Sequence, residues 1–406
     1  MTDDEREPVG SDRPHGFSTR AIHEGDLTQS GISEQPVSPP IWLTADYVYE
    51  GLEHYSDVIN ERRPGFVYGR FGNPTHVALH NVLASLDSAE AAWSFASGMA
   101  AVHTAITALV ENGEHVVAQK TLYGGTYGFL TKLFPRYGGE ATFVPAEADA
   151  VAGAIRPNTK AVIIEPLANP TFGVADVRGV AAVCAERGVP LLVDNTVATP
   201  YLLRPLEIEG VTLVIHSTTK YIGGHSSLMG GSVAGSRELV DRIRHFAIDQ
   251  GTTAGAFEAW LALLGVQTLP VRVERQCSTA MALARFLAEH PKVADVGYSG
   301  LPEHPDHDRA TSLFDAGRYG PMLAFTLEGG YDAAIRMCDS LRVIRVGSSF
   351  GSLHSLVCQP ATTSHRQLSK EDREAAGIDD GLIRFAVGGE DPGDLIADLD
   401  QALEKV

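Results

Sequence analysis

The sequence predicts an α/β fold with a large parallel sheet, followed by a smaller α+β domain at the C-terminus. Short, continuous apolar runs alternate with helical segments between about residues 94 and 215, as is typical of parallel strands covered on both faces. A helix-rich bridge at about 254–289 then leads into mixed strands and helices. We expect an N-terminal arm at 1–60, a large domain at 61–265 and a C-terminal domain at 266–406.

The N-terminal segment lacks a regular apolar period. Residues 1–16 are acidic, polar and contain Pro and Gly, which predicts disorder. Residues 17–60 read as an extended arm with turn signals at QPVSPP. A loop at 61–74 then precedes a helix that starts near Thr75, and SFASGM leads into a second helix that ends near Val110.

The pattern of apolar residues predicts where the later strands and helices lie. Strands are expected at 115–119, 141–144, 160–165, 189–194, 211–215 and 322–327. Helices are expected at 123–137, 176–187, 331–339 and 392–404.

Composition excludes several classes of partner. The chain has 406 residues, with 32 Lys and Arg against 51 Asp and Glu, a net charge of -19 that no basic block offsets. Nucleic acids and anionic membranes are therefore poor partners. The four cysteines show no metal or redox spacing, and no apolar run approaches membrane-spanning length, so we expect a cytoplasmic protein.

Lys220 is the leading candidate for a catalytic residue. It follows the apolar run VTLVI, which would put it at the carboxyl edge of the sheet, where ligands bind in open α/β folds. Small hydroxyl residues precede it and glycines follow it. A buried lysine amine loses its charge readily and can form a Schiff base with an aldehyde cofactor. The alternative is a surface lysine in a flexible loop.

Four other positions support the Schiff-base interpretation. Asp194 ends the strand VPLLVD at the same edge, where its carboxylate would either keep a pyridine nitrogen protonated or cap a turn. Gly98 and Met99 start a helix, a place that favours phosphate but is also an ordinary helix start. Tyr123 would stack on a cofactor ring or pack in the core. Arg384 lies in an apolar strand-like segment and needs an anion, such as a substrate carboxylate.

Six motifs resemble one family in order along the chain: YGRFGNPT, SFASGMAA, EPLANPTFGVADV, VDNTVATPYLLRPLE, STTKYIGGHS and LIRFAVGGEDPGDLIADL. The family is that of the Cys/Met-metabolism (trans-sulfuration) enzymes, which depend on pyridoxal 5'-phosphate. The resemblance covers nearly everything from about Thr19 onward. It implies the aminotransferase-like fold (fold type I) and a homotetramer built from two active-site dimers.

The resemblance also implies a role for each matching residue. Lys220 would form the Schiff base and move the protons, while Asp194 pairs with the pyridine nitrogen and Tyr123 stacks on the ring. The phosphate would be held by Gly98, Met99, Ser217 and Thr219, with Tyr68 and Arg70 from a neighbouring subunit. The substrate carboxylate would be held by Asn169, Ser349 and Arg384.

The expected reaction is γ-elimination or γ-replacement on a homoserine- or homocysteine-type amino acid, in primary or specialised metabolism. An O-acyl-homoserine sulfhydrylase, a β-lyase and a cofactor-binding regulatory protein remain alternatives. The substrate-facing positions depart from the family pattern at Asp46, Gly125, Ser227, Leu264, Ser348 and Gln359. Many members have Glu at the position of Ser348, and methionine γ-lyases have Cys at that of Gly125, so charge and bulk are lost and room for a larger γ-substituent is expected.

A second cluster, LPEHPDHD, brings His304, Asp306, His307 and Asp308 together in sequence. Such residue types bind metals, but a loop broken by prolines seldom fixes ligand geometry. We therefore expect no metal site.

Overall fold

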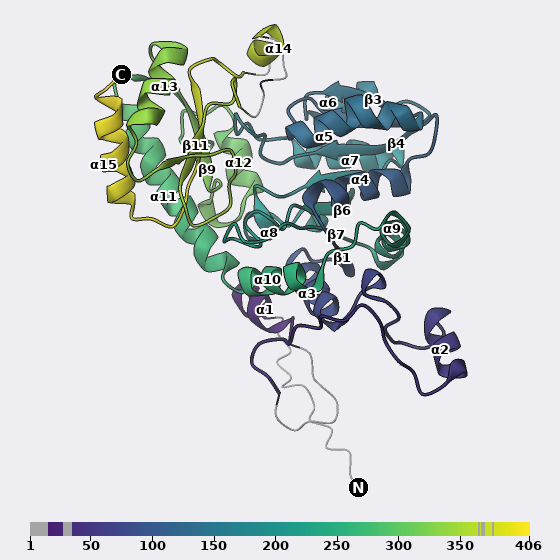
Figure 1. Ribbon diagram of the computed structural model, residues 1–406. Helices are drawn as coiled ribbons and strands as arrows, with labels where there is room; N and C mark the ends of the chain where they lie inside the picture. Colours follow the sequence, from purple (N-terminus) through teal and green to yellow (C-terminus); the bar gives the residue numbers. More distant parts are fainter. Residues whose placement is uncertain (1–14, 27–34, 364–365, 367–369, 376) are drawn as a thin grey trace.

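The structure is a computed structural model that describes residues 15–26, 35–363, 366, 370–375 and 377–406. Figure 1 shows two sheets beside each other, each with its own helices, and the long helix α11 (Leu269–Glu289), which runs from α10 up along the small sheet beside α15. The prediction of disorder for residues 1–16 lies almost wholly outside the described residues. No helix in the described part is long and apolar enough to cross a membrane.

The large sheet has seven strands within the described residues, in the order β1-β7-β6-β5-β4-β2-β3. Their bounds are β1 Ala91–Phe95, β2 His115–Gln119, β3 Glu140–Val144, β4 Thr159–Ile164, β5 Leu191–Asp194, β6 Val211–His216 and β7 Gly231–Gly235. Strands β2 to β6 pair in parallel, as predicted, and form the edge that carries Lys220.

The sheet is mixed rather than wholly parallel, because β7 runs antiparallel to both β1 and β6. The sequence of β7 is GSVAG, whose small residues give no apolar run. The glycine is required by packing, since a side chain at Gly231 would run into the carbonyl of Ser97. Strand β7 thus brings the start of α4 (Gly98–Leu109) against the end of β6.

Two layers of helices cover this sheet. Helix α4 and α9 (Arg237–Gln250) pack on one face, where Leu192, Leu213 and Ile215 belong to their core. Val193, Ile164 and Leu191 point to the opposite core, with α3 and α7. The remaining helices of this half are α3 Pro74–Leu86, α5 Gly124–Gly128, α6 Ala148–Ala154, α7 Val177–Arg187, α8 Thr199–Leu202 and α10 Ala256–Gln267.

Short helical turns complete this half: η1 Gly69–Phe71, the π-helix η2 Phe129–Leu133, η3 Phe134–Tyr137 and η4 Pro205–Glu207. The helix expected at 123–137 begins at Gly124 and is broken into α5, η2 and η3.

The irregular arm expected at 17–60 contains two helices, which is a correction. α1 (Phe17–His23) packs against α3 and α10 and buries Ala21 completely. α2 (Leu52–Ile59) projects from the body in Figure 1. Both helices are at most eight residues long, too short for a clear apolar period, and α1 is fixed by tertiary contacts rather than by its own propensity.

The small sheet has the order β10-β11-β12-β9-β8 within the described residues. Its strands are β8 Val293–Gly297, β9 Met322–Leu327, β10 Arg345–Val346, β11 Leu356–Cys358 and β12 Leu382–Ala386. Its helices are α12 His307–Leu313, η5 Asp315–Gly317, α13 Gly330–Ser340, α14 Lys370–Ala375 and α15 Pro392–Leu403. Helices α11, α13 and α15 share one apolar core with this sheet. We propose that the domain boundary lies near residue 265, before α11.

Asp398 of α15 fixes the segment that leads to the predicted substrate-binding serine. Its side chain is 4% exposed and accepts the backbone N–H groups of Arg342 (2.9 Å), Val343 (2.8 Å) and Ile344 (2.8 Å). Buried amides need an acceptor, so this carboxylate orders the chain just before Ser348.

Replacing Asp398 by Ala should lower the free energy of unfolding by about 2–4 kcal/mol, because three amides lose their acceptor. Asp394→Ala is the matched control: Asp394 lies exposed in the first turn of the same helix, so the loss should be below about 1 kcal/mol. Urea unfolding measures both, and equal losses would show that the Asp398 contacts do not stabilise this segment.

Candidate active site

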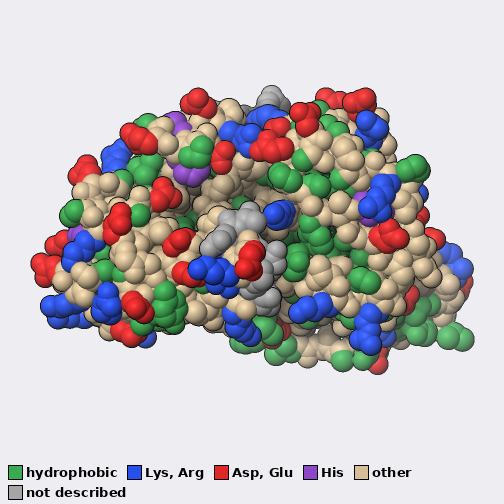
Figure 2. Space-filling model, turned by 90° about the horizontal axis from the view of Figure 1, so that it is seen from above, with side chains coloured by type: hydrophobic (Ala, Val, Ile, Leu, Met, Phe, Trp, Pro, Cys, Tyr) green, Lys and Arg blue, Asp and Glu red, His purple; other side chains and the backbone are tan. Residues whose placement is uncertain are grey.

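A cavity of about 240 Å³ lies at the carboxyl edge of β5 and β6 and is lined by most of the predicted site residues. Figure 2 shows that the face seen from above is hollowed near its middle, with a basic side chain at the margin. The predicted residues that line the cavity are Gly98, Met99, Tyr123, Asn169, Asp194, Ser217, Thr219 and Lys220. They come from five separate stretches of sequence, which the parallel strands bring to one edge.

Lys220 lies in the turn that follows β6. Its Nζ donates a hydrogen bond to Oγ of Ser349 at 3.0 Å and lies 4.8 Å from the ring centroid of Phe350. Burial, and then the positive charge of Arg384, lower the pKa of Lys220 below its ordinary value. The amine is therefore easier to deprotonate than a surface lysine, as a nucleophile toward an aldehyde must be.

Asp194 lies at the end of β5 with one carboxylate oxygen held and the other free. Its Oδ1 accepts hydrogen bonds from the Thr196 hydroxyl (2.5 Å) and the Thr196 amide (3.1 Å). The Thr196 hydroxyl in turn accepts the amide of Ser217 at 2.8 Å. Burial raises the pKa of Asp194, while Thr196 and the positive charge of His216 limit the rise. Its Oδ2 accepts no hydrogen bond from the described residues and is available to a ligand.

The start of α4 provides donors for an anion. Ser97 caps the helix, since its hydroxyl accepts the amide of Ala100 at 3.0 Å. The amides of Gly98 and Met99 have no acceptor within the helix. They lie at the positive end of the helix dipole, beside the cavity. A Cβ on Gly98 would lie 2.7 Å from Cβ of Ser217, so only glycine permits this close approach to the turn after β6.

Arg384 reaches the site from the small sheet. It lies on β12, is 2% exposed, and donates through Nη2 to the carbonyls of Ser348 (2.6 Å) and Ser349 (3.0 Å). Its Nε is buried without a hydrogen-bond partner among the described residues. Oδ1 of Asn169, which lines the cavity, is likewise buried and unpaired there. Within the described part of the chain this buried guanidinium is held only by carbonyls and lacks a counter-ion.

Tyr123 stands half-exposed at the rim, and its amide donates to Glu165 at 2.7 Å. A Cβ on Gly125 would lie 2.5 Å from the Tyr123 ring and 2.9 Å from Sδ of Met99. The absence of a side chain at Gly125 therefore makes room for the tyrosine ring itself. This differs from the expectation that the position is left open for substrate.

Tyr68 and Arg70 do not line this cavity. Tyr68 is 41% exposed, and Nη1 of Arg70 donates to the carbonyl of Ile248 at 2.6 Å. Both lie at η1, in the segment between α2 and α3. Asp46 pairs with Tyr68 in an isolated antiparallel bridge. Their position therefore gives them no role at the cavity of their own chain.

Several cavity residues had no assigned role in the sequence, among them Glu165, Phe350 and Thr196. Burial, and then repulsion by Asp194, raise the pKa of Glu165 well above its ordinary value. Phe350 packs between the cations of Lys220 and Arg384. Glu165 opens the motif EPLANP and Phe350 follows Ser349, so proximity to predicted site residues is the only sequence signal for them.

The cluster at 304–308 is engaged in local structure. Nδ1 of His304 accepts the Asp306 amide at 3.1 Å, and Nδ1 of His307 donates to the carbonyl of Ser299 at 2.9 Å. Asp306 also accepts the amide of Val174 at 2.9 Å. The described part of the chain contains no group of three or more His, Cys, Asp or Glu side chains that fits a metal ion.

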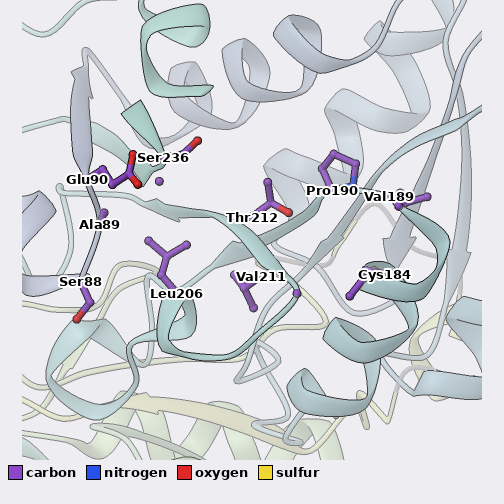
Figure 3. Close-up of a pocket in the computed structure, with 14 residues that line it drawn as sticks. Ser88, Ala89, Glu90, Cys184, Val189, Pro190, Leu206, Val211, Thr212 and Ser236 are labelled. Atoms are coloured by element: carbon purple, nitrogen blue, oxygen red, sulfur yellow. The ribbon is translucent and has the colours of Figure 1, made fainter. Parts of the chain in front are cut away.

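A larger cavity of about 500 Å³ lies at the opposite, amino edge of β5 and β6 (Figure 3). Its polar side chains already have partners: Glu90 accepts the amide of Arg237 at 2.9 Å, and Ser88 donates to Glu207 at 2.8 Å. Cys184 in this cavity is a buried residue of α7. The cavity has no cluster comparable to that around Lys220.

Comparison with known proteins agrees with this geometry. Residues 18–404 match the family model of the Cys/Met metabolism PLP-dependent enzymes. An L-methionine gamma-lyase of Fusobacterium nucleatum is 36% identical, over 97% of this chain and 99% of its own length. A cystathionine gamma-synthase of Mycobacterium tuberculosis is 37% identical, over 96% of this chain and 97% of its own.

A solved structure shares the fold. The putative O-acetylhomoserine (thiol)-lyase of Campylobacter jejuni, which contains a pyridoxyl-lysine monophosphate, has a TM-score of 0.91 and 30% identity, over 96% of this chain and 100% of its own. The expected fold type I is thus confirmed. The chain belongs to the Cys/Met metabolism family of PLP-dependent enzymes.

Proposed function

We propose that this chain, with PLP attached to Lys220, eliminates or replaces the γ-substituent of a homoserine- or homocysteine-type amino acid. One observation carries the proposal. The amine of Lys220 lies at the cavity and close to a buried arginine. Its Nζ contacts the hydroxyl of Ser349, and the carbonyl of Ser349 accepts a hydrogen bond from Arg384. An amino acid whose carboxylate is held by Arg384 would present its Cα side to this amine.

The residues present fit the cofactor. The amides of Gly98 and Met99, with the hydroxyls of Ser217 and Thr219, would hold the phosphate. The free oxygen of Asp194 would hold the proton of the ring nitrogen, and Tyr123 would cover the ring. When bound, PLP supplies an electron sink that makes the Cα proton, and then the Cβ proton, of the substrate acidic.

The protein's own groups move the protons. When the substrate amine takes its place on the cofactor, the freed neutral amine of Lys220 would be the base, because burial and Arg384 disfavour its charged form. Oγ of Ser349, 3.0 Å away, fixes the position of Nζ. Arg384, with Asn169 and Ser349, would anchor the carboxylate and satisfy the orphaned Nε and Oδ1 atoms.

The rim of the site suits γ-replacement at least as well as simple elimination. Ser348 is exposed and small where many family members have Glu, so an anionic nucleophile or leaving group meets no carboxylate there. Not every departure bears on substrate: Gln359 is buried and donates to the carbonyl of Asp380 at 2.5 Å, which makes it a structural residue.

The proposal also concerns how the subunits assemble. Several large apolar side chains of the N-terminal segment are almost fully exposed, including Val37 (98%), Val48 (99%) and Leu52 (82%). Such a surface is typical of an interface. We propose a homotetramer of active-site dimers in which Tyr68 and Arg70 reach the phosphate site of a neighbouring subunit.

Arg384→Lys should weaken amino-acid binding by about 10- to 100-fold and leave cofactor affinity nearly unchanged, because an ammonium cannot bind a carboxylate in two places. Arg318→Lys, at an ion pair with Glu274 outside the cavity, is the control and should change neither affinity. Spectroscopic titration measures both constants. Unchanged substrate binding in Arg384→Lys would make this arginine a purely structural residue.

The reaction itself is tested in heavy water with acylated homoserines, cystathionine, methionine and S-adenosylmethionine. We expect deuterium at Cα and Cβ of a good substrate, and faster turnover when a thiol is supplied. Lys220→Ala should show no exchange. Rapid release of keto acid and thiol from methionine or cystathionine alone would assign elimination instead. Exchange confined to Cα across the panel would contradict γ-chemistry.

A further inference from the structure

A buried ion pair lies beneath the carboxyl edge of the large sheet. Nε2 of His216 lies 2.9 Å and 3.1 Å from the two carboxylate oxygens of Asp87, and the two side chains are 1% and 0% exposed. Asp87 directly follows α3, and no other described residue donates a hydrogen bond to its carboxylate. A carboxylate without access to water requires a positive partner.

The surroundings of His216 favour the doubly protonated ring. Burial lowers the pKa of His216, but the charge and hydrogen bonds of Asp87, the charge of Asp194 and the carbonyl of Asn195 together raise it above its ordinary value. Because Nε2 faces both oxygens of a buried carboxylate, this position favours the ring that carries a proton and a positive charge. The contact with Asp87 thus favours a positive charge at the end of β6.

This charge lies next to Asp194 but outside the cavity. Asp194 pairs with Ile215 across β5 and β6, so His216 is one residue further along. Ile215 points into the core with α4, and alternation along the strand turns His216 to the opposite face, toward α3. Neither His216 nor Asp87 lines the cavity, whereas Asp194 does.

We propose that His216 and Asp87 are positioning residues for Asp194: the imidazolium, fixed by Asp87 behind the sheet, keeps Asp194 ionised so that its free oxygen holds a proton on the cofactor's ring nitrogen. The proposal rests on the proposed function, which puts PLP in the cavity. It assigns a role to the end of α3, which does not line the cavity. Thr196 orients the same carboxylate from the cavity side.

The test uses protein loaded with pyridoxal phosphate labelled with 15N in the ring, with the nitrogen resonance read by NMR. In the wild type we expect a protonated ring nitrogen. In Asp87→Asn and His216→Gln, attachment to Lys220 should persist, while the ratio of protonated to neutral nitrogen falls about tenfold or more. His115→Gln is the matched control, because His115 is also buried in this sheet but is bonded only to threonine hydroxyls, at the opposite edge.

A purely structural pair would give a different result. If both variants melted at lower temperature, as His115→Gln should, yet kept the wild-type nitrogen resonance, the proposal would be overturned. So would a wild-type protein, labelled with 15N-histidine, that shows no doubly protonated imidazole assignable to His216 at pH 8, a measurement that does not depend on the variants folding. A wild-type protein that carries no cofactor on Lys220 would instead refute the proposed function, and this proposal with it.

Discussion

The unbalanced positive charge of Arg384 is the constraint on which the rest of the site depends. The guanidinium is buried on β12, and the described residues offer it carbonyl oxygens but no carboxylate. It lowers the pKa of the nearby Lys220 amine, and its Nη2 holds the segment that carries Ser349. A bound amino-acid carboxylate would supply the missing anion, so substrate binding and the reactivity of the lysine are linked through one residue.

The large sheet positions the site residues that lie on the other side of the cavity from Arg384. Parallel strands end at one edge, and there β5 contributes Asp194 and β6 leads into Lys220. The antiparallel β7 draws the start of α4 against this edge, which brings the Gly98 and Met99 amides to the cavity. Behind this edge the buried carboxylate of Asp87 contacts His216, and the charge of His216 limits the rise in the pKa of Asp194 that burial causes.

The sequence was most informative where local pattern and chemistry coincide. The strands β2, β4, β5, β6 and β9 are continuous apolar runs, and Lys220, Asp194 and Gly98 follow or precede such elements, so their meeting at one edge was predictable. Strand β7 and helices α1 and α2 were not, because packing rather than composition determines them. Phe350, Glu165 and the pair of Asp87 and His216 act through contacts distant in sequence, which no local pattern encodes.

The central claim is that Lys220 carries the cofactor, and its most direct test is chemical. The protein loaded with PLP is reduced with borohydride, digested and mapped by mass spectrometry, with Lys220→Ala treated in parallel. Our account predicts one pyridoxyl-modified peptide, the one that contains Lys220, and no covalent label in the variant. A label on another lysine, or a label that persists in Lys220→Ala, would contradict it.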